Sequence, residues 1–355
     1  MISDDIKERL YLEAVVAEQT GTLTVEQLKI IYREKWFKLF VPKEYDGLEL
    51  SLPDGLRIEE ALAAIDGSLG WTVTLCSGAT MFIGYLEQDI SKIIFKDKKV
   101  CFGGSGRPSG IATVNSSGYE VNGFWHYATG APHNTVFTAN CVIEQDGVVL
   151  KHPDGSPIIQ SFFFTRDEVT ILDDWNTMGL KATAGHSFEV KNLQRADNRS
   201  FIIDSNHATL PHPVYHYPFL QFAEATIAVN TLGMAQHFLE ECKCIFNKKN
   251  NNSKSPLLCE KLHNAIHELS LARQQFYATA EASWEAFTHH TTEEGPTLQE
   301  VSKISREMVR TARALVSELY PFCGMIAADP ASTINRIWRD IYTGSQHSLL
   351  NFPAE

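Results

Sequence analysis

The chain has 355 residues, of which 44% are hydrophobic and 21% are charged, as in an ordinary globular protein. This supply of apolar side chains excludes a mainly disordered chain. The formal net charge of −12 argues against a nucleic acid or an anionic membrane surface as partner, because both bind basic surfaces.

The seven cysteines are odd in number and scattered, and no CxxC pair occurs. This pattern indicates a reduced, cytoplasmic protein with neither a disulfide framework nor a zinc ribbon. The N-terminus begins MISDDIKERL, with acidic residues where a signal peptide has basic ones. His263 and His267 lie four residues apart, but no third ligand stands nearby, so we expect no metal site.

Residues 1–98 are predicted to form a helical domain. Residues 54–65 follow Pro53 with one apolar face, which favours a helix. Residues 67–86 contain no charged residue but include four glycines and several Ser and Thr. That composition is too polar for a membrane span and predicts a buried core helix.

Residues 99–205 have the composition of strands joined by turns such as Ser117-Gly118 and Asp154-Gly155. No helical pattern separates the strands, so we expect an antiparallel β-barrel or β-sandwich. The glycine-rich segment 103–110 is not expected to be a dinucleotide-binding loop. Pro108 stands where the helix should start, and strand-like residues follow.

Residues 206–355 return to helical spacing and predict a four-helix bundle. Two start signals stand out, namely Ser255-Pro256 and a capping box over residues 297–300. The predicted fold class is therefore α+β, with an N-terminal helical domain, a middle β domain and a C-terminal bundle.

Two segments carry candidate chemistry. In residues 123–141, Tyr127 and Thr129 could stack beside a flavin and reach its polar edge, although an aromatic-rich barrel core is the alternative interpretation. Residues 334–351 are expected to begin as a helix that carries Arg339 and Asp340, and His347 stands where the chain should leave that helix. A lone histidine is often structural, so His347 gains weight only if this segment closes over a cofactor.

With these segments in place, the chain resembles the acyl-CoA dehydrogenase fold superfamily over nearly its whole length. Five pieces match in register: residues 39–48 with the "P-x-x-Y-G-G" turn, residues 123–130 with the flavin-side strand, residues 174–183 with the second β-domain motif, residues 225–239 with the first bundle helix, and residues 335–340 with "R-x-x-R-D".

Within the superfamily, the chain looks closer to the oxygenase components of two-component flavin-dependent monooxygenases. Residues 67–71 resemble their "S-x-G-W" helix start, residues 125–130 their "W-x-F-x-S-G", and Arg339-Asp340 with His347 their "R-D…H" ending. The resemblance implies reduced flavin from a separate reductase and a small aromatic or heteroatom substrate. Departures are Gly78-Ala79 in place of a histidine, and residues 181–185 in place of "R-G-T-G-S".

Two alternatives stay open. An FAD-dependent acyl-CoA dehydrogenase would need a glutamate base, which commonly follows the Arg-Asp pair where Thr343 stands here. Some branches carry that glutamate on an earlier bundle helix instead, so this alternative stays open. A degenerate, non-catalytic flavin-binding protein is the other alternative.

The resemblance also implies the site residues. His347 is expected to be catalytic, and the flavin is expected to contact the following positions: Tyr127, Ala128, Thr129, Trp175, Thr183 and Gly324. Gly324 resembles a glycine loop that reaches a neighbouring subunit's cofactor, so a homotetramer is expected. The "R-x-x-F-G" motif is replaced by residues 246–252, which lack its arginine and glycine. We therefore expect FMN to be favoured over FAD.

Overall fold

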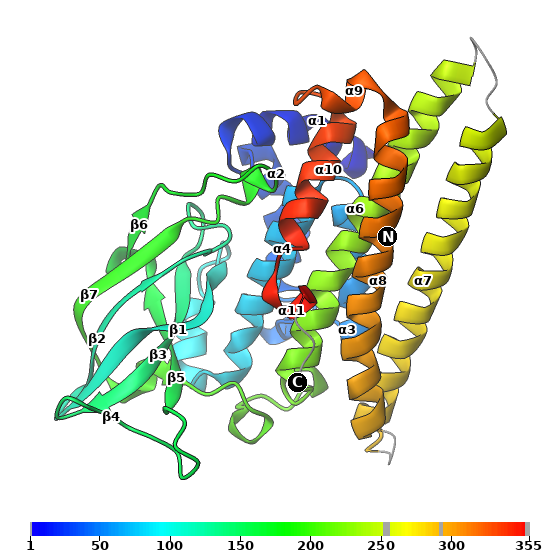
Figure 1. Ribbon diagram of the computed structural model, residues 1–355. Helices are drawn as coiled ribbons and strands as arrows, with labels where there is room; N and C mark the ends of the chain where they lie inside the picture. The colour runs from blue at the N-terminus through cyan, green and yellow to red at the C-terminus, as the bar shows by residue number, and fades with distance from the viewer. Residues whose placement is uncertain (1, 251–255, 291–293, 352–355) are drawn as a thin grey trace.

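The computed structural model describes residues 2–250, 256–290 and 294–351. Its elements follow one another as helices, then strands, then helices (Figure 1). The N-terminal helices are α1 (Asp4–Thr20), α2 (Val25–Arg33), α3 (Leu52–Ala63), α4 (Gly67–Thr80) and α5 (Gln88–Ile94). The strands are β1 (Phe102–Asn115), β2 (Gly118–Trp125), β3 (Val136–Gln145), β4 (Val148–Val149), β5 (Ile159–Thr165), β6 (Thr170–Leu172), β7 (Ser187–Arg195) and β8 (Ser200–Phe201).

The C-terminal helices are α6 (Phe219–Asn250), α7 (Pro256–Thr288), α8 (Glu294–Cys323), α9 (Met325–Ala328), α10 (Thr333–Gly344) and α11 (Ser348–Asn351). The predicted α+β class is confirmed. The predicted division at residues 1–98, 99–205 and 206–355 stays a prediction. In the part of the chain that the structure describes, no helix is long and apolar enough to cross a membrane.

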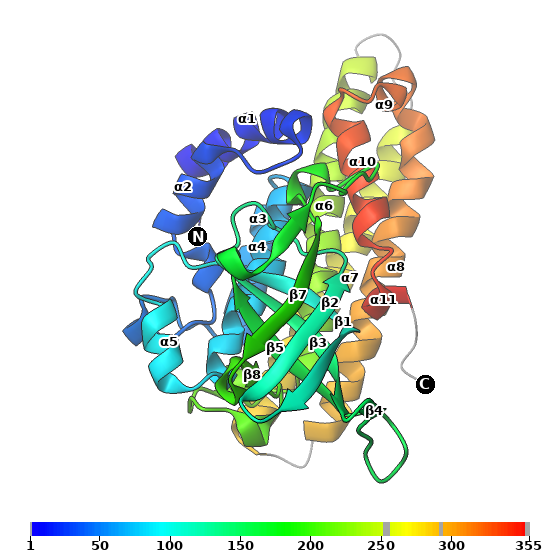
Figure 2. The same ribbon diagram turned by 90° about the vertical axis from the view of Figure 1, so that its left-hand side faces the viewer.

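The strands form one sheet with the order β6-β7-β2-β1-β3-β5-β8, and β4 pairs with β3. The expectation of a purely antiparallel sheet is wrong, because β1 and β3 run parallel. After the β1–β2 hairpin, the chain crosses the start of β1 through residues 126–135 and begins β3 on its other side. This short crossover needs no helix. The sheet is also open rather than a closed barrel, with β6 at one edge and β8 at the other. Figure 2 shows strands β7, β2, β1 and β3 of this sheet in front of the C-terminal helices.

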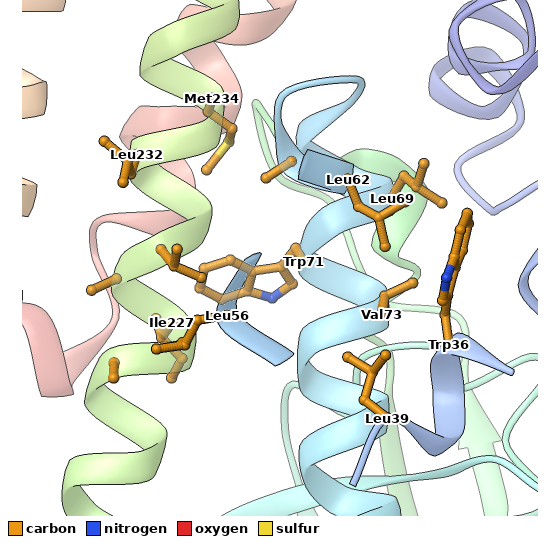
Figure 3. Close-up of a cluster of buried hydrophobic side chains, with 14 of the residues drawn as sticks. Trp36, Leu39, Leu56, Leu62, Leu69, Trp71, Val73, Ile227, Leu232 and Met234 are labelled. Atoms are coloured by element: carbon orange, nitrogen blue, oxygen red, sulfur yellow. The ribbon is translucent and has the colours of Figure 1, made fainter. Parts of the chain in front are cut away.

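Helix α4 lies between the sheet and the bundle (Figure 1). Asp66 caps its N-terminus by accepting a hydrogen bond from the Leu69 N–H at 2.9 Å. Most of its residues are buried, as expected for the uncharged run 67–86. Figure 3 shows Trp71 extending from α4 toward α6. Because both faces of this helix pack against protein, its sequence has no polar face.

Helices α6, α7, α8 and α10 form the C-terminal bundle, with α7 as the outermost helix (Figure 1). The predicted capping box over residues 297–300 is wrong, because α8 already begins at Glu294. The helix continues through Pro296, which the first turn tolerates because its missing N–H has no intrahelical partner there. Ser255, the other predicted cap, lies outside the described residues.

Helix α10 is fixed by three separate polar contacts. The Arg336 Nε lies 3.6 Å from Asp66, and the Arg339 guanidinium lies 2.6 Å from Glu18. Asp340 instead accepts a hydrogen bond from the backbone of Leu180. The arginine and aspartate residues of the "R-x-x-R-D" motif therefore tie α10 to three other segments rather than to each other.

Candidate active site

A cavity of about 340 Å³ lies between helices α4 and α6, strands β1 and β3, and the C-terminal segment. Its apolar wall is formed by Leu75, Phe82, Phe219, Phe222, Ile227 and Leu349. Its polar lining residues are Thr74, Ser105, Thr129, Thr138, Asn140, Ser161, Thr226 and His347. Among its lining residues in the described ranges, there is no Asp, Glu, Lys or Arg. The cavity therefore suits a flat, uncharged group with a few polar atoms.

Small residues create this space. A Cβ on Gly104 would lie 1.9 Å from the Thr138 carbonyl oxygen, so only glycine allows the two strands to approach there. A Cβ on Gly106 would meet no atom within 4 Å. On α4, a Cβ on Gly78 would have Phe222 as its nearest neighbour, at 3.7 Å. The segment 103–110 is thus a strand that borders the cavity, not a phosphate loop.

Thr129 reaches the cavity because β2 ends just before it. Trp125 is buried and stacks on Phe188 at 5.2 Å, so this aromatic belongs to the core of the β domain. The backbone then turns at Tyr127, whose φ is 68°. The Thr129 carbonyl accepts a hydrogen bond of 2.8 Å from Asn134 Nδ2. These contacts hold the segment that brings Thr129 to the cavity wall.

His347 lines the same cavity from the opposite end of the chain. Its ring packs edge-on near Trp71, with centroids 6.2 Å apart. Its Nδ1 accepts a hydrogen bond from the Leu349 N–H at 3.4 Å, so a neutral ring carries its proton on Nε2. Burial lowers the pKa of His347 below its ordinary value, because the charged form loses hydration. His347 is therefore neutral at pH 7 and able to accept a proton.

Tyr127 and Trp175 form an aromatic pair next to this region, with ring centroids 6.1 Å apart. Tyr127 is 69% exposed. The Trp175 Nε1 and the Thr183 hydroxyl both donate to the Leu180 carbonyl, at 3.0 and 2.8 Å. These two hydrogen bonds hold Trp175 and Thr183 within their own segment, residues 175–183. Neither the Tyr127 ring nor the Trp175 ring lines the cavity.

Backbone hydrogen bonds join the Tyr127 segment to the Thr183 segment. The Ala128 N–H donates to the His186 carbonyl at 3.1 Å, and the Gly130 N–H donates to the Thr183 carbonyl at 2.8 Å. The predicted residues Tyr127, Ala128, Thr129, Trp175 and Thr183 therefore gather in one region. Only Thr129 and His347 face the cavity.

Gly324 is separate from this region. It lies between α8 and α9 with a φ of 75° and is exposed. Its neighbours Met325 and Ile326 are 85% and 52% exposed. The expected contact of Gly324 with the flavin of a second copy of the chain stays a prediction.

Sequence reasoning missed the α4 and α6 contributions to the cavity. Thr74, Gly78 and Ala79 come from α4, and Phe222 and Thr226 come from α6. One signal was available, since glycine within a strand or a buried helix often marks the close approach of a ligand or backbone.

The cavity residues fit a flavin ring system. A tricyclic ring is flat, largely apolar on its faces and polar at one edge. The cavity offers phenyl groups and glycine backbone for the faces, and Thr129 with His347 for polar contacts.

Three kinds of similarity agree with this geometry. Residues 225–352 match the family described as acyl-CoA dehydrogenase, C-terminal domain. The solved structure of the HsaA monooxygenase from M. tuberculosis superposes with a TM-score of 0.90 at 21% identity, covering 98% of this chain and 92% of that one. Residues 225–352 thus carry the family match, and the whole chain shares the fold of this solved structure.

Two curated relatives of the chain are monooxygenases. Indole-3-acetate monooxygenase of Pseudomonas putida is 23% identical over 324 residues, which cover 88% of this chain and 80% of the relative. The flavin-dependent monooxygenase oxygenase subunit HsaA of Mycobacterium tuberculosis (strain ATCC 25618 / H37Rv) is 24% identical over 366 residues. The aligned part covers 97% of this chain and 90% of the relative.

Two further solved structures of this fold contain flavins. XiaF from Streptomyces sp., in complex with FADH2 and glycerol, has a TM-score of 0.85 at 19% identity and covers 98% of this chain and 90% of its own. TdsC from Paenibacillus sp. A11-2, with FMN and indole, has a TM-score of 0.79 at 17% identity. The superposition covers 98% of this chain and 92% of the TdsC chain.

Proposed function

We propose that this chain is the oxygenase component of a flavin-dependent monooxygenase that acts on a small, neutral aromatic substrate. The observation that carries the proposal is the uncharged cavity that joins Thr129 to His347 between glycine backbone and phenyl rings. The monooxygenase relatives described above support the same reaction class.

Reduced flavin, when bound, supplies two electrons to dioxygen, so that one oxygen atom enters the substrate and the other becomes water. The chain's own residues would hold the reactants and move protons. The Thr129 hydroxyl would form a hydrogen bond with the polar edge of the flavin ring. His347, neutral at pH 7, would take a proton from the substrate. Trp175, braced by its bond to Leu180, would help to exclude water.

The cavity disfavours an acyl-CoA dehydrogenase. That reaction needs a carboxylate to remove an α-proton, and no described carboxylate lines the cavity. Thr343, which replaces the glutamate of some dehydrogenases, has a hydroxyl that cannot act as a base at neutral pH.

FMN is proposed to bind at least as well as FAD. The stretch 246–252 lacks the arginine that would meet the FAD pyrophosphate of a partner subunit, so the AMP half of FAD loses an anchor. The lysines of this stretch would contact a phosphate only as point charges. Residues 251 and 252 lie outside the described residues. FMN and FADH2 occur in TdsC and XiaF respectively, so this fold accepts both classes of flavin.

The proposed partners are a separate flavin reductase and further copies of the same chain in a cytoplasmic homotetramer. Exposed apolar residues support self-association. They lie around Gly324 and on the outer helix α7: Leu257, Ile266, Leu271, Met325 and Ile326. Light scattering at micromolar concentration should give a tetramer mass, and a monomer mass would contradict this part of the proposal.

The test is an anaerobic titration with reduced FMN and reduced FAD, followed by a pulse of dioxygen with indole as the probe substrate. Binding of reduced flavin and formation of an oxygenated product are expected. Reduction of oxidised flavin by an acyl-CoA would instead identify a dehydrogenase. A protein that holds no flavin in either redox state would indicate the non-catalytic alternative.

A further inference from the structure

Two cysteines and a histidine meet on the far side of the Thr129 segment. Cys76 belongs to α4, Cys101 immediately precedes β1, and His133 lies in the crossover between β2 and β3. One donor atom from each side chain lies within 4.8 Å of the other two. Three segments that are far apart in the sequence thus bring thiol and imidazole groups to one point.

Burial makes this cluster unusual. Both cysteines have no exposed surface and neither forms a disulfide. Both ring nitrogens of His133 are buried and have no hydrogen-bond partner. An unsatisfied buried polar atom lowers the free energy of unfolding by about 1–3 kcal/mol. A bound group that contacts these nitrogens would therefore supply the partner that the protein atoms do not provide.

The orientation of the histidine is set by its neighbours. The ring stacks on Phe37, with centroids 5.3 Å apart and an interplanar angle of 15°. A Cβ on Gly130 would lie 2.7 Å from His133 Nε2 and 3.0 Å from Cys76 Sγ. Both atoms therefore face the same small space, which a glycine keeps free.

Asn134 turns its amide oxygen toward the same space. Its Nδ2 donates a hydrogen bond to the Thr129 carbonyl at 2.8 Å. Its Oδ1 lies 3.3 Å from Cys101 Sγ and 3.7 Å from Cys76 Sγ. The donor set is thus two sulfurs, one imidazole nitrogen and a nearby amide oxygen.

We propose that Cys76, Cys101 and His133 bind a thiophilic divalent cation of the Zn²⁺ class. Thiolate and imidazole are the ligands that zinc prefers in proteins, and two cysteines with one histidine leave a fourth position open. Two thiolates also neutralise the charge of the ion, so burial of the complete site leaves no net charge. Residue spacing gave no sign of this site, because its ligands come from three different segments.

A bound ion would link α4, the start of β1 and the crossover segment. The Thr129 carbonyl lies 3.7 Å from Cys76 Sγ and accepts the Asn134 hydrogen bond. The ion would therefore fix the segment that carries Thr129 to the cavity. This inference does not depend on the proposed reaction.

The test is metal content measured by mass spectrometry on full-length protein, kept reduced and stripped with chelator, then dialysed against Zn²⁺ or Co²⁺. One ion per chain is expected, with a thiolate-to-cobalt charge-transfer band in the Co²⁺ form. Cys101→Ser and His133→Gln should each weaken binding at least about tenfold and remove or alter that band.

The matched control is Cys242→Ser. Cys242 and Cys323 form the other close thiol pair, with sulfurs 3.5 Å apart, and they belong to no group of three potential ligands among the described residues. This variant should retain the ion. The proposal is overturned if the reduced wild type binds no metal, or if a folded ligand variant binds as much metal as the control. Circular dichroism of each variant verifies that it is folded, and either ligand variant suffices for the comparison.

Discussion

The side chain of Asp340, in α10, accepts a hydrogen bond of 2.6 Å from the backbone N–H of Leu180, in the loop before β7. Asp340 is 1% exposed. Together with the hydrogen bond from Arg339 to the Met178 carbonyl, this contact ties the helix that precedes His347 to the segment that holds Trp175 and Thr183. Burial, together with the nearby Asp66 charge, raises the pKa of Asp340 well above its ordinary range.

Asp340→Ala should therefore lower the free energy of unfolding by about 1–3 kcal/mol, because the Leu180 N–H loses its buried acceptor. Asp340→Asn keeps an acceptor oxygen without a charge and should stay closer to wild type. Urea denaturation at pH 7 measures both. Equal losses in the two variants would show that the charge, and not the hydrogen bond, is what matters.

His347→Ala should reduce turnover of the proposed aromatic substrate by about 10²–10⁴-fold, the usual contribution of a general base. Flavin affinity should change little, because His347 is only one of several polar residues that line the cavity. Steady-state kinetics and flavin titration separate the two effects. Unchanged turnover with normal flavin binding would assign His347 a purely structural role.

The pH profile tests the same residue independently. Burial lowers the pKa of His347 below its ordinary value of 6.5, so the neutral base persists as the pH falls through 6.5. The acidic limb of kcat/KM should therefore lie below pH 6.5, and activity should fall only when the imidazole becomes protonated. The residual rate of His347→Gln should lack this limb. An acidic limb above pH 6.5 would contradict the burial argument.

Gly78 tests the cavity. Gly78→Ala should stabilise the protein by up to about 1 kcal/mol, because alanine favours a helix and the nearest atom is 3.7 Å from the new Cβ. Gly78→Leu should place a larger side chain in the cavity and raise the KM for the aromatic substrate.

The matched control is Gly70→Ala, in the same helix. There the new Cβ would lie 2.5 Å from the Ala63 Cα, so the variant should be destabilised despite the same gain in helix propensity. Thermal unfolding compares the two alanine variants. If the Tm rises in both variants, helix propensity alone determines the change in stability and the close contact at Gly70 has no effect.

Glu59 and Glu60 are adjacent buried residues of α3 whose carboxyl groups have different contacts. Burial raises the pKa of Glu59 well above 4.5, and its Oε2 has no hydrogen-bond partner. Above pH 4.5 the unfolded state ionises Glu59 while the folded state retains the proton, so stability is lost as the pH rises. Glu60 instead pairs with Arg273 at 2.6 Å and accepts a hydrogen bond from Tyr277 at 2.5 Å.

Glu59→Gln should therefore gain stability relative to wild type as the pH rises from about 5 to 8. Glu60→Gln should lose stability at neutral pH, since it breaks the ion pair. Unfolding free energies measured across this pH range test both. A difference between Glu59→Gln and wild type that stays constant with pH would contradict the assignment of a neutral Glu59.

The sequence by itself determined the order of the elements and the resemblance to the acyl-CoA dehydrogenase fold superfamily. The uncharged run 67–86 predicts a buried helix because an element covered on both faces needs no polar side. Tyr127, Thr129 and His347 stand in motifs that could be matched residue by residue. These features depend on local spacing, which a sequence displays directly.

Only the tertiary structure decided the rest. The parallel β1–β3 pair depends on where the crossover at 126–135 leads, which no local pattern specifies. The cavity depends on Gly78 and Gly106 facing one space from different elements. The Cys76, Cys101 and His133 cluster likewise combines three distant segments. Such sites arise from long-range packing, so the spacing of their residues along the chain gives no sign of them.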